Sequence, residues 1–474
     1  DVQMESVYDQ ISNGFKDLPE NELLTIHMRS FVDDTERTTY LAGLVSKTAN
    51  PVLKYLATSD LRRTEILSKK KLRKGKTLRM FATFTWDADA DVQDDKVEKL
   101  TKGFLKALGN FSGAEKIKKS QEFFAFLEAG FNAFLLWEQI FTNKMGLTVR
   151  ALSAEQLWGD LWHRYNSIPC IPVPQKLIFD RESIKEEINS DIHALSLLMY
   201  REQSVPTADY RWMRLKQKFI GLLALLDQPD SWETERDAIN FYWNKLSEDL
   251  VSDISIVTQL SKVSQTEMRQ RLTDLTKEQI FKAGKASEEG DINVGAAMDL
   301  DEALEARAYL HMGHVALSSA TVFMVERDTV DELDRACNYL ESLFLYPANL
   351  HRENTYLWRT WAQTQPICRT KLLSHPYNRV GKVFSSYVLG TVPLAQVRTI
   401  DRSGVEFLSD DGGVPIYLDL VKKHHNIVFL ATTRTGKSVT LTAFVNNFLM
   451  NNVPVSIIDY PPTDDASTFK DYSK

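Results

Sequence analysis

The sequence predicts an α/β protein, in which a mixed region with a ferredoxin-like order of strands and helices precedes the first strand–turn–helix unit of a further domain. Three observations predict this class. Near the N-terminus, strand-like alternation of apolar and polar residues gives way twice to helical spacing. The same succession returns between residues 219 and 344. Close to the C-terminus, a glycine-lysine-serine turn stands between an apolar run and an amphipathic segment.

The size and composition predict several folded domains. A chain of 474 residues is too long for one ordinary core, and we place the domains at residues 1–175, 176–400 and 401–474. The content of 43% hydrophobic and 26% charged residues is typical of a globular protein. The net charge of -7 gives no general attraction to nucleic acid. Three cysteines and nine histidines, of which His311 and His314 form one close pair, suggest neither a disulfide framework nor a metal cluster.

The first domain reads as β-α-β-α. Residues 22–32 and 77–86 alternate as half-buried strands. A helical stretch over residues 36–56 separates them, and Pro51 is expected to break or bend it. A helix with Val97, Leu100, Phe104 and Leu108 on one face follows the second strand. This succession favours a ferredoxin-like arrangement with the helices on one face of a sheet.

A long helical region is expected over residues 115–165. Its most apolar window, residues 123–137, contains Glu128 and is too short to span a membrane. We interpret this window as a core helix, with a partner-binding helix as the alternative. Pro169, Pro172 and Pro174 then predict a semi-rigid connector between domains.

The second predicted domain again alternates strands and helices. Strands are expected over residues 219–226, 252–260 and 311–326, and helices over residues 231–246, 265–285 and 329–344. Asp230 or Ser231 can cap the first of these helices. Residues 286–299 are acidic and contain glycine, which predicts an exposed loop. Short strands and turns are expected from residue 387 to 420.

The chemistry of the chain is expected near its C-terminus. An apolar strand over residues 425–430 leads into Ala431-Thr-Thr-Arg-Thr-Gly-Lys-Ser438, then an amphipathic helix and a second strand over residues 454–459. This is the context of a phosphate-binding loop. Its backbone amides and helix dipole suit a triphosphate. Lys437 would bind the β and γ phosphates and is the candidate catalytic residue, and the Ser438 hydroxyl would face Mg²⁺. The candidate nucleotide-binding residues are Thr432, Thr433, Arg434, Thr435, Gly436, Lys437, Ser438 and Val439.

Two positions depart from the commonest form of this loop. Ala431 and Arg434 stand where glycines are frequent. A positive φ at either would cost about 1 kcal/mol and weaken nucleotide binding. Asp459, at the end of the second strand, is a candidate magnesium ligand, with a structural role as the alternative. Because few residues follow the loop, we expect residues 401–474 to form only the start of a nucleotide-binding domain.

The chain resembles the TraC-like ATPases of conjugation and type IV secretion systems. The lead-in Gly413–Asp419, the segment HNIVFLATTRTGKS and the segment PVSIIDY carry the resemblance. It implies a RecA-like P-loop motor behind a large N-terminal α/β region. It further implies a hexameric, cytoplasmic ATPase with ATP and Mg²⁺ as cofactors, peripheral to the bacterial inner membrane. There it would dock on subunits of the secretion channel and energise pilus assembly or substrate transfer.

Two other functions stay open. A DNA translocase of the FtsK or HerA type would share the same RecA-like motor domain. It needs a basic channel, however, and residues 421–474 are not notably basic. A scaffold that binds nucleotide without hydrolysing it would suit the unusual loop. Nine basic residues between Arg62 and Arg79 can contact nucleic acid or phospholipid, but we interpret this segment as a solvated loop between a helix and a strand.

Overall fold

The protein is mixed α/β and separates into two compact units. The computed structural model describes residues 2–31, 34–86, 113–166, 168–179, 184–199, 207–229, 232, 234–245, 253–288, 294–366, 368, 370–376, 378–394, 401, 403–409, 413–421, 423, 426–430 and 436–458. The first unit comprises residues 1–28, 78–242 and 255–394, and the second comprises residues 29–77, 243–254 and 395–474. The predicted domain boundaries at residues 175 and 400 stay a prediction.

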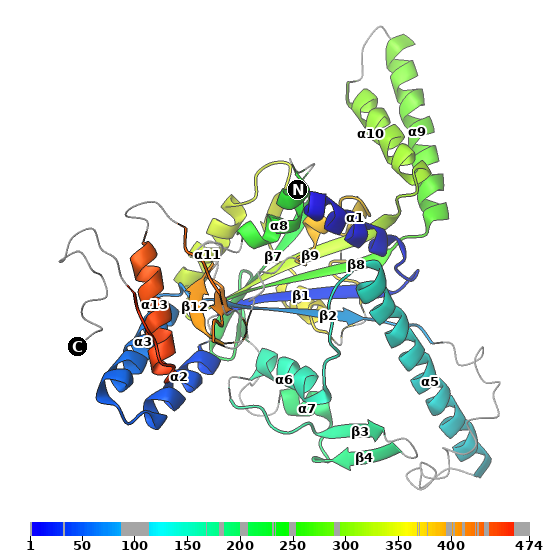
Figure 1. The fold of residues 1–474 in the computed structure, drawn as a ribbon. Coiled ribbons are helices and arrows are strands. Elements are labelled where there is room, and N and C mark those ends of the chain that lie inside the picture. The colour runs from blue at the N-terminus through cyan, green and yellow to red at the C-terminus, as the bar shows by residue number, and fades with distance from the viewer. Residues whose placement is uncertain are drawn as a thin grey trace. The chain divides into compact units, whose positions relative to one another are not determined.

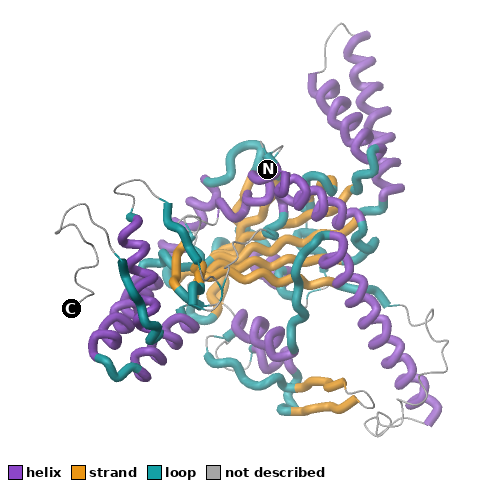
Figure 2. Tube along the Cα trace, viewed as in Figure 1, coloured by secondary structure: helices purple, strands orange, loops and turns teal. Residues whose placement is uncertain are grey.

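A large, mainly antiparallel sheet is the centre of the first unit (Figures 1 and 2). Its strands follow the order β2-β1-β8-β9-β7-β6-β5, while β10 pairs with β7 and β11 pairs with β9. The strands are β1 (Leu23–Phe31), β2 (Gly75–Ala82), β5 (Thr207–Ala208), β6 (Met213–Leu215), β7 (Lys218–Asp227), β8 (Ile254–Lys262), β9 (Ala316–Arg327), β10 (Asn349–Arg352) and β11 (Gly381–Phe384).

The ferredoxin-like strand order lies in the second half of this sheet. Strands β10, β7, β9 and β8 are neighbours in that order, so β9 lies between the two strands joined by α8 (Glu235–Lys245). This is the split strand–helix–strand arrangement. We had expected the ferredoxin-like arrangement in the first predicted domain, residues 1–175. In that part of the chain β1 and β2 are instead direct neighbours, and they extend the sheet beyond β8.

Both faces of the central strands are covered. Gly221 of β7 turns toward α11 (Val330–Ser342), and the side chains nearest to it are those of Leu333 and Cys337. The next residue, Leu222, packs instead in a cluster with Trp361 of α12 (Leu357–Gln363). Successive residues of a strand point to opposite faces, so α11 and α12 lie on opposite sides. Strands buried on both faces tend to be continuously apolar, as residues 219–226 of β7 are.

A helical hairpin is inserted between β8 and β9. Helices α9 (Gln265–Glu288) and α10 (Val294–His311) pack side by side and reach away from the sheet (Figure 1). Residues 286–288 and 294–299, which were expected to lie in a loop, are therefore helical, and the strand expected from residue 311 begins at Ala316. Helix α10 carries apolar and acidic residues all round, so its sequence lacks the apolar stripe that identifies an amphipathic helix.

The predicted 50-residue helical region is broken into parts. Helix α5 (Gly113–Gln139) continues into the π-helix η2 (Ile140–Lys144), and α6 (Ala154–Tyr165) starts at a Ser153 capping box. Phe124 and Trp137 are buried, whereas Phe131 and Phe134 on α5 are 53% and 47% exposed. The expected core helix is thus buried only in part. The unit also contains α1 (Val2–Lys16), β3 (Gln175–Phe179), β4 (Ile184–Ile188), α7 (Ala194–Leu198) and the 3-10 helix η4 (Val388–Thr391).

The second unit joins two N-terminal helices to the C-terminal segment. Helices α2 (Thr35–Lys47) and α3 (Pro51–Lys69) are separated at Pro51, which occupies the first turn of α3 as predicted for a helix break. Strands β12 (Val405–Leu408) and β13 (Pro415–Leu418) form an antiparallel hairpin. Helix α13 (Lys437–Met450) follows the glycine-lysine turn and packs against α3 and β12.

The basic segment is only in part the solvated loop that we expected, because an exposed turn over residues 70–72 is flanked by helical and buried residues. Its first part belongs to α3, which runs to Lys69. Arg73 and Lys74 are buried, with 4% and 1% exposure. The Lys74 N–H donates to the Gly413 carbonyl. This part of the segment therefore serves packing inside the second unit.

Two predicted features lie outside the described residues: the helix containing Val97 and Leu108, and the caps Asp230 and Ser231. Thr234 does accept a hydrogen bond from the Asp237 N–H at the start of α8. Across the described ranges, no helix is long and apolar enough to cross a membrane.

Candidate functional site

The glycine of the predicted phosphate-binding loop has the backbone conformation that such a turn requires. Gly436 is the N-cap of α13, with φ 84° and ψ 10°. Among the described residues, a Cβ at this position would meet nothing within 4 Å. Glycine is therefore favoured here by the left-handed backbone and not by a lack of space.

Helix α13 begins, directly after this glycine, with N–H groups that have no partner inside the helix. Its first internal hydrogen bond runs from the Thr440 N–H to the Gly436 carbonyl, at 3.0 Å. The preceding N–H groups, those of Lys437, Ser438 and Val439, have no partner within the helix. They lie at the positive end of the helix dipole, which favours an anion.

The side chains that follow Gly436 are accessible. Lys437 and Val439 are exposed, and Ser438 is half-buried. The structure thus gathers four of the predicted nucleotide-binding residues in one helical turn. The others, Thr432 to Thr435, together with Ala431 and Asp459, lie outside the described residues. Their roles stay predictions.

The two strands expected on either side of the loop are not formed. Residues 426–430 and 454–458 are irregular. Leu430 and Ile458 are 90% and 98% exposed. Their apolar sequences suit a buried strand, but a strand also needs a neighbour with which to pair. Within the described part of the chain, neither segment has one.

Aromatic packing fixes the direction of α13. Phe444, which is 1% exposed, lies 5.3 Å from Phe429 and 5.7 Å from Phe407 of β12, measured between ring centroids. At the other end of the helix, the Tyr40 hydroxyl donates to Asn451 Oδ1 at 2.9 Å. The segment before the loop, the β hairpin and α2 therefore hold the helix that begins at Lys437.

Charged side chains from α2, α3 and the turn after α3 form a largely buried charge cluster around Glu406 of the β12–β13 hairpin. Arg73 donates from Nε to Glu406 Oε1 at 3.2 Å and from a terminal nitrogen to Oε2 at 3.0 Å. The Tyr417 hydroxyl donates to Glu406 Oε2 at 2.6 Å. Arg37 of α2 pairs with Asp60 of α3 at 2.7 Å and approaches Glu406 at 3.8 Å.

These contacts shift the pKa values of the cluster. Burial by itself would raise the pKa of Glu406, but hydrogen bonds from Arg73 and Tyr417 outweigh it and lower that pKa. Burial and the hydrogen bond to Glu406 raise the pKa of Tyr417 to about 12. Glu406 is therefore a carboxylate and Tyr417 a neutral phenol at neutral pH.

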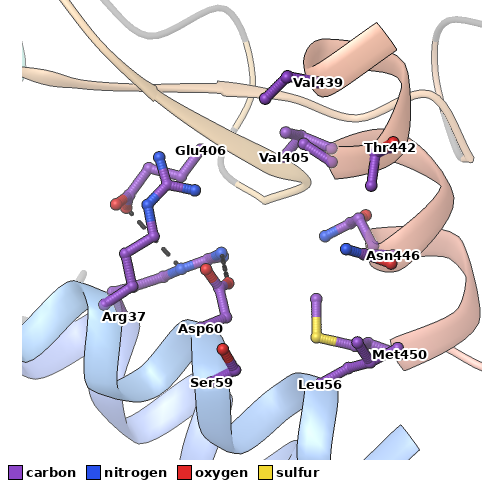
Figure 3. Close-up of a pocket in the computed structure, with 13 residues that line it drawn as sticks. Arg37, Leu56, Ser59, Asp60, Val405, Glu406, Val439, Thr442, Asn446 and Met450 are labelled. Atoms are coloured by element: carbon purple, nitrogen blue, oxygen red, sulfur yellow. Dashed lines mark hydrogen bonds and ion pairs between the residues drawn. The ribbon is translucent and has the colours of Figure 1, made fainter. Parts of the chain in front are cut away.

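A pocket of about 260 Å³ opens between α3, β12 and α13 (Figure 3). Arg37, Asp60 and Glu406 lie on one side of it, and α13 lines the other side with Val439, Thr442, Asn446 and Met450. Neither the pocket nor the charge cluster is apparent from the sequence. The available signal was a lone glutamate in the apolar strand Val405–Leu408, which needs a cation when it is buried.

The described residues hold no group of three or more His, Cys, Asp or Glu side chains that could bind a metal ion. A magnesium ion at this site would take its ligands from Ser438, phosphate oxygens and water, which is how Mg²⁺ is usually bound beside a nucleotide.

Comparisons with known proteins add no family. No protein-family model matches the chain, and no curated protein matches it.

Proposed function

We propose that the protein binds ATP with Mg²⁺ at the N-terminus of α13 and acts as the ATP-binding motor subunit of a type IV secretion or conjugative transfer apparatus. The observation that supports nucleotide binding is the left-handed Gly436, which directly precedes Lys437 and Ser438 at the start of α13. The proposal of a secretion motor rests on the resemblance of this segment to TraC-like ATPases.

The residues of this turn fit a triphosphate. The first-turn amides, which have no partner inside α13, would bind phosphate oxygens, and no described residue would crowd the approach to Gly436. The exposed ammonium group of Lys437 would neutralise the β and γ phosphates. Ser438 would supply its hydroxyl to Mg²⁺. Bound ATP would supply the driving force for substrate transfer.

The resemblance also suggests the cellular setting. We propose a homo-hexamer on the cytoplasmic face of a bacterial inner membrane, docked on channel subunits. The RecA-like domain, of which residues 401–474 would be the start, belongs to the same proposal.

Nucleotide binding is tested by titration calorimetry of the 474-residue chain with Mg²⁺–ATP. We expect Lys437→Ala to abolish binding, because the lysine is the cation closest in sequence to the phosphate-binding amides. Lys54→Ala, which removes an exposed lysine of α3, is the matched control and should bind as the unmodified chain does. Equal affinities of the Lys437→Ala variant and the control would refute the site.

Phosphate release and oligomeric state test the motor. Turnover that is lost in Lys437→Ala supports an ATPase, whereas tight binding without turnover identifies a nucleotide-binding scaffold. Stimulation of turnover by DNA that declines steeply with salt would identify a DNA translocase instead. Analytical ultracentrifugation with and without Mg²⁺–ATP tests the hexamer.

A further inference from the structure

The pocket beside α13 shares a wall with the proposed phosphate site. Val439 follows Ser438 directly and lines the pocket, which then extends along α13 to Met450. In a nucleotide, only a ribose separates the base from the phosphates. Phosphates bound at the first turn of α13 therefore leave the base within reach of the pocket mouth.

The lining combines apolar surface with amide groups. Leu56 of α3, Val405 of β12 and Ala443 and Met450 of α13 contribute apolar atoms. Asn446 and Asn447 contribute carboxamides, which both donate and accept hydrogen bonds. A planar heteroaromatic base needs both kinds of partner, since its faces are apolar and its edges carry donors and acceptors.

The charges at the pocket balance one another. Asp60 and Glu406 supply two carboxylates to the lining, and Arg37 and Arg63 supply two guanidinium groups. Because Arg37 pairs with Asp60 and Arg73 pairs with Glu406, the lining suits a neutral polar group. The volume of about 260 Å³ is just below the range of about 300–1,000 Å³ that is typical of small-molecule sites, and this size suits a base with its ribose.

Arg37 anchors the polar side of the pocket. It is 5% exposed, and its terminal nitrogens bind Asp60 and the Gly404 carbonyl. Its buried Nε lies 3.8 Å from Glu406 Oε2. Arg37 therefore holds the carboxylates of Asp60 and Glu406 in place at the pocket wall.

We infer that the pocket between α3, β12 and α13 binds the base and ribose of the nucleotide whose phosphates lie at Lys437. This inference rests on the proposed function and specifies its ligand: a nucleoside triphosphate that is held by its base as well as by its phosphates, with the N-terminal helix α3 forming part of the site.

A comparison of Mg²⁺–ATP with Mg²⁺–tripolyphosphate tests the base pocket separately from the phosphate site. Calorimetry on the 474-residue chain should show ATP binding at least about tenfold tighter than tripolyphosphate, which has no base. Ala443→Phe fills the pocket from α13, and Ser59→Phe fills it from α3. Both variants should bind ATP only as tightly as tripolyphosphate, with tripolyphosphate affinity unchanged. Leu449→Phe, on α13 but outside the pocket lining, should retain the preference for ATP.

Each outcome decides a different point. Equal binding of ATP and tripolyphosphate by the unmodified chain overturns the base pocket and leaves the phosphate site intact. Undiminished ATP affinity in both filled variants overturns it as well. If Ala443→Phe also weakens tripolyphosphate binding, the substitution has damaged α13 itself. The ATP affinity of Ser59→Phe then decides whether the pocket binds the base. Failure of the unmodified chain to bind either ligand overturns the proposed function together with this inference.

Discussion

Arg73 and Glu406, which are 333 residues apart in the chain, form a bidentate ion pair inside the second unit. Two guanidinium nitrogens reach the two carboxylate oxygens at 3.2 and 3.0 Å. The side chains are 5% and 9% exposed. The pair joins the end of the N-terminal helical segment to β12, the strand that packs against α13. The candidate nucleotide site therefore depends on residues from both ends of the chain.

Glu406→Gln should destabilise the second unit. The substitution leaves the buried Arg73 without its carboxylate, and removing one partner of a buried pair typically costs about 3–5 kcal/mol. Urea unfolding followed by circular dichroism measures the change. Glu36→Gln, at an exposed position on α2, controls for the loss of one negative charge. An unchanged unfolding midpoint would show that the ion pair does not stabilise the unit.

Acid should weaken the protein through the same carboxylate. Folding lowers the pKa of Glu406 below its ordinary value of 4.5. The contribution of this carboxylate to the free energy of unfolding is therefore fully present above pH 4.5. It is lost as the pH falls through the lower pKa of the folded state. Urea midpoints measured across this acid range should fall less steeply in Glu406→Gln than in the unmodified chain. Parallel pH curves for the two proteins would contradict the assignment.

Cys337 should resist thiol reagents in the folded protein. It is fully buried, and burial raises the pKa of its thiol to about 11. Cys170 is exposed. At about pH 8, near the ordinary thiol pKa of about 8.5, iodoacetamide should label Cys170 and spare Cys337 until urea unfolds the chain. Peptide mass spectrometry measures both sites. Labelling of the two cysteines at similar rates would contradict the packing of α11 on the sheet.

Local patterns were enough to predict the elements that carry their own signal. Strands β1, β7 and β8 lie where alternating or continuous apolar residues predict them. Helix α11 begins after Thr329, as its sequence indicates, and α13 begins directly after Gly436. In each case the apolar face or the capping residue lies within the segment itself, so neighbours distant in sequence are not needed to identify it.

Elements that depend on distant partners were missed. The short strands β5 and β6 exist through pairing with each other and with β7. The arginine at residue 73 looks like a solvated cation until Glu406 is placed beside it. The strand expected at residues 425–430 shows the opposite error, because an apolar run predicts a strand even where the described chain offers no strand to pair with it.

The candidate site was only partly predictable for the same reason. The glycine-lysine-serine turn is a contiguous motif, and it identified the start of α13. The pocket beside it combines α3, β12 and α13, whose lining residues range from Arg37 to Met450. No sequence pattern connects these segments, so only their folding together shows that α3 contributes to the site.

Gly436→Ala tests whether the left-handed turn matters for nucleotide binding. Alanine at φ 84° is strained by about 1–2 kcal/mol. We expect the turn to relax and the first amides of α13 to lose their common direction, so that Mg²⁺–ATP affinity falls and the unfolding free energy decreases by a similar amount. Gly43→Ala is the matched control, because Gly43 lies inside α2 in the same unit with open space around its Cα. In a helix interior, this substitution should stabilise by about 0.5–1 kcal/mol and leave ATP affinity unchanged. Calorimetry and urea unfolding of both variants measure the contrast. Full ATP affinity in Gly436→Ala would show that the phosphates do not bind at this turn.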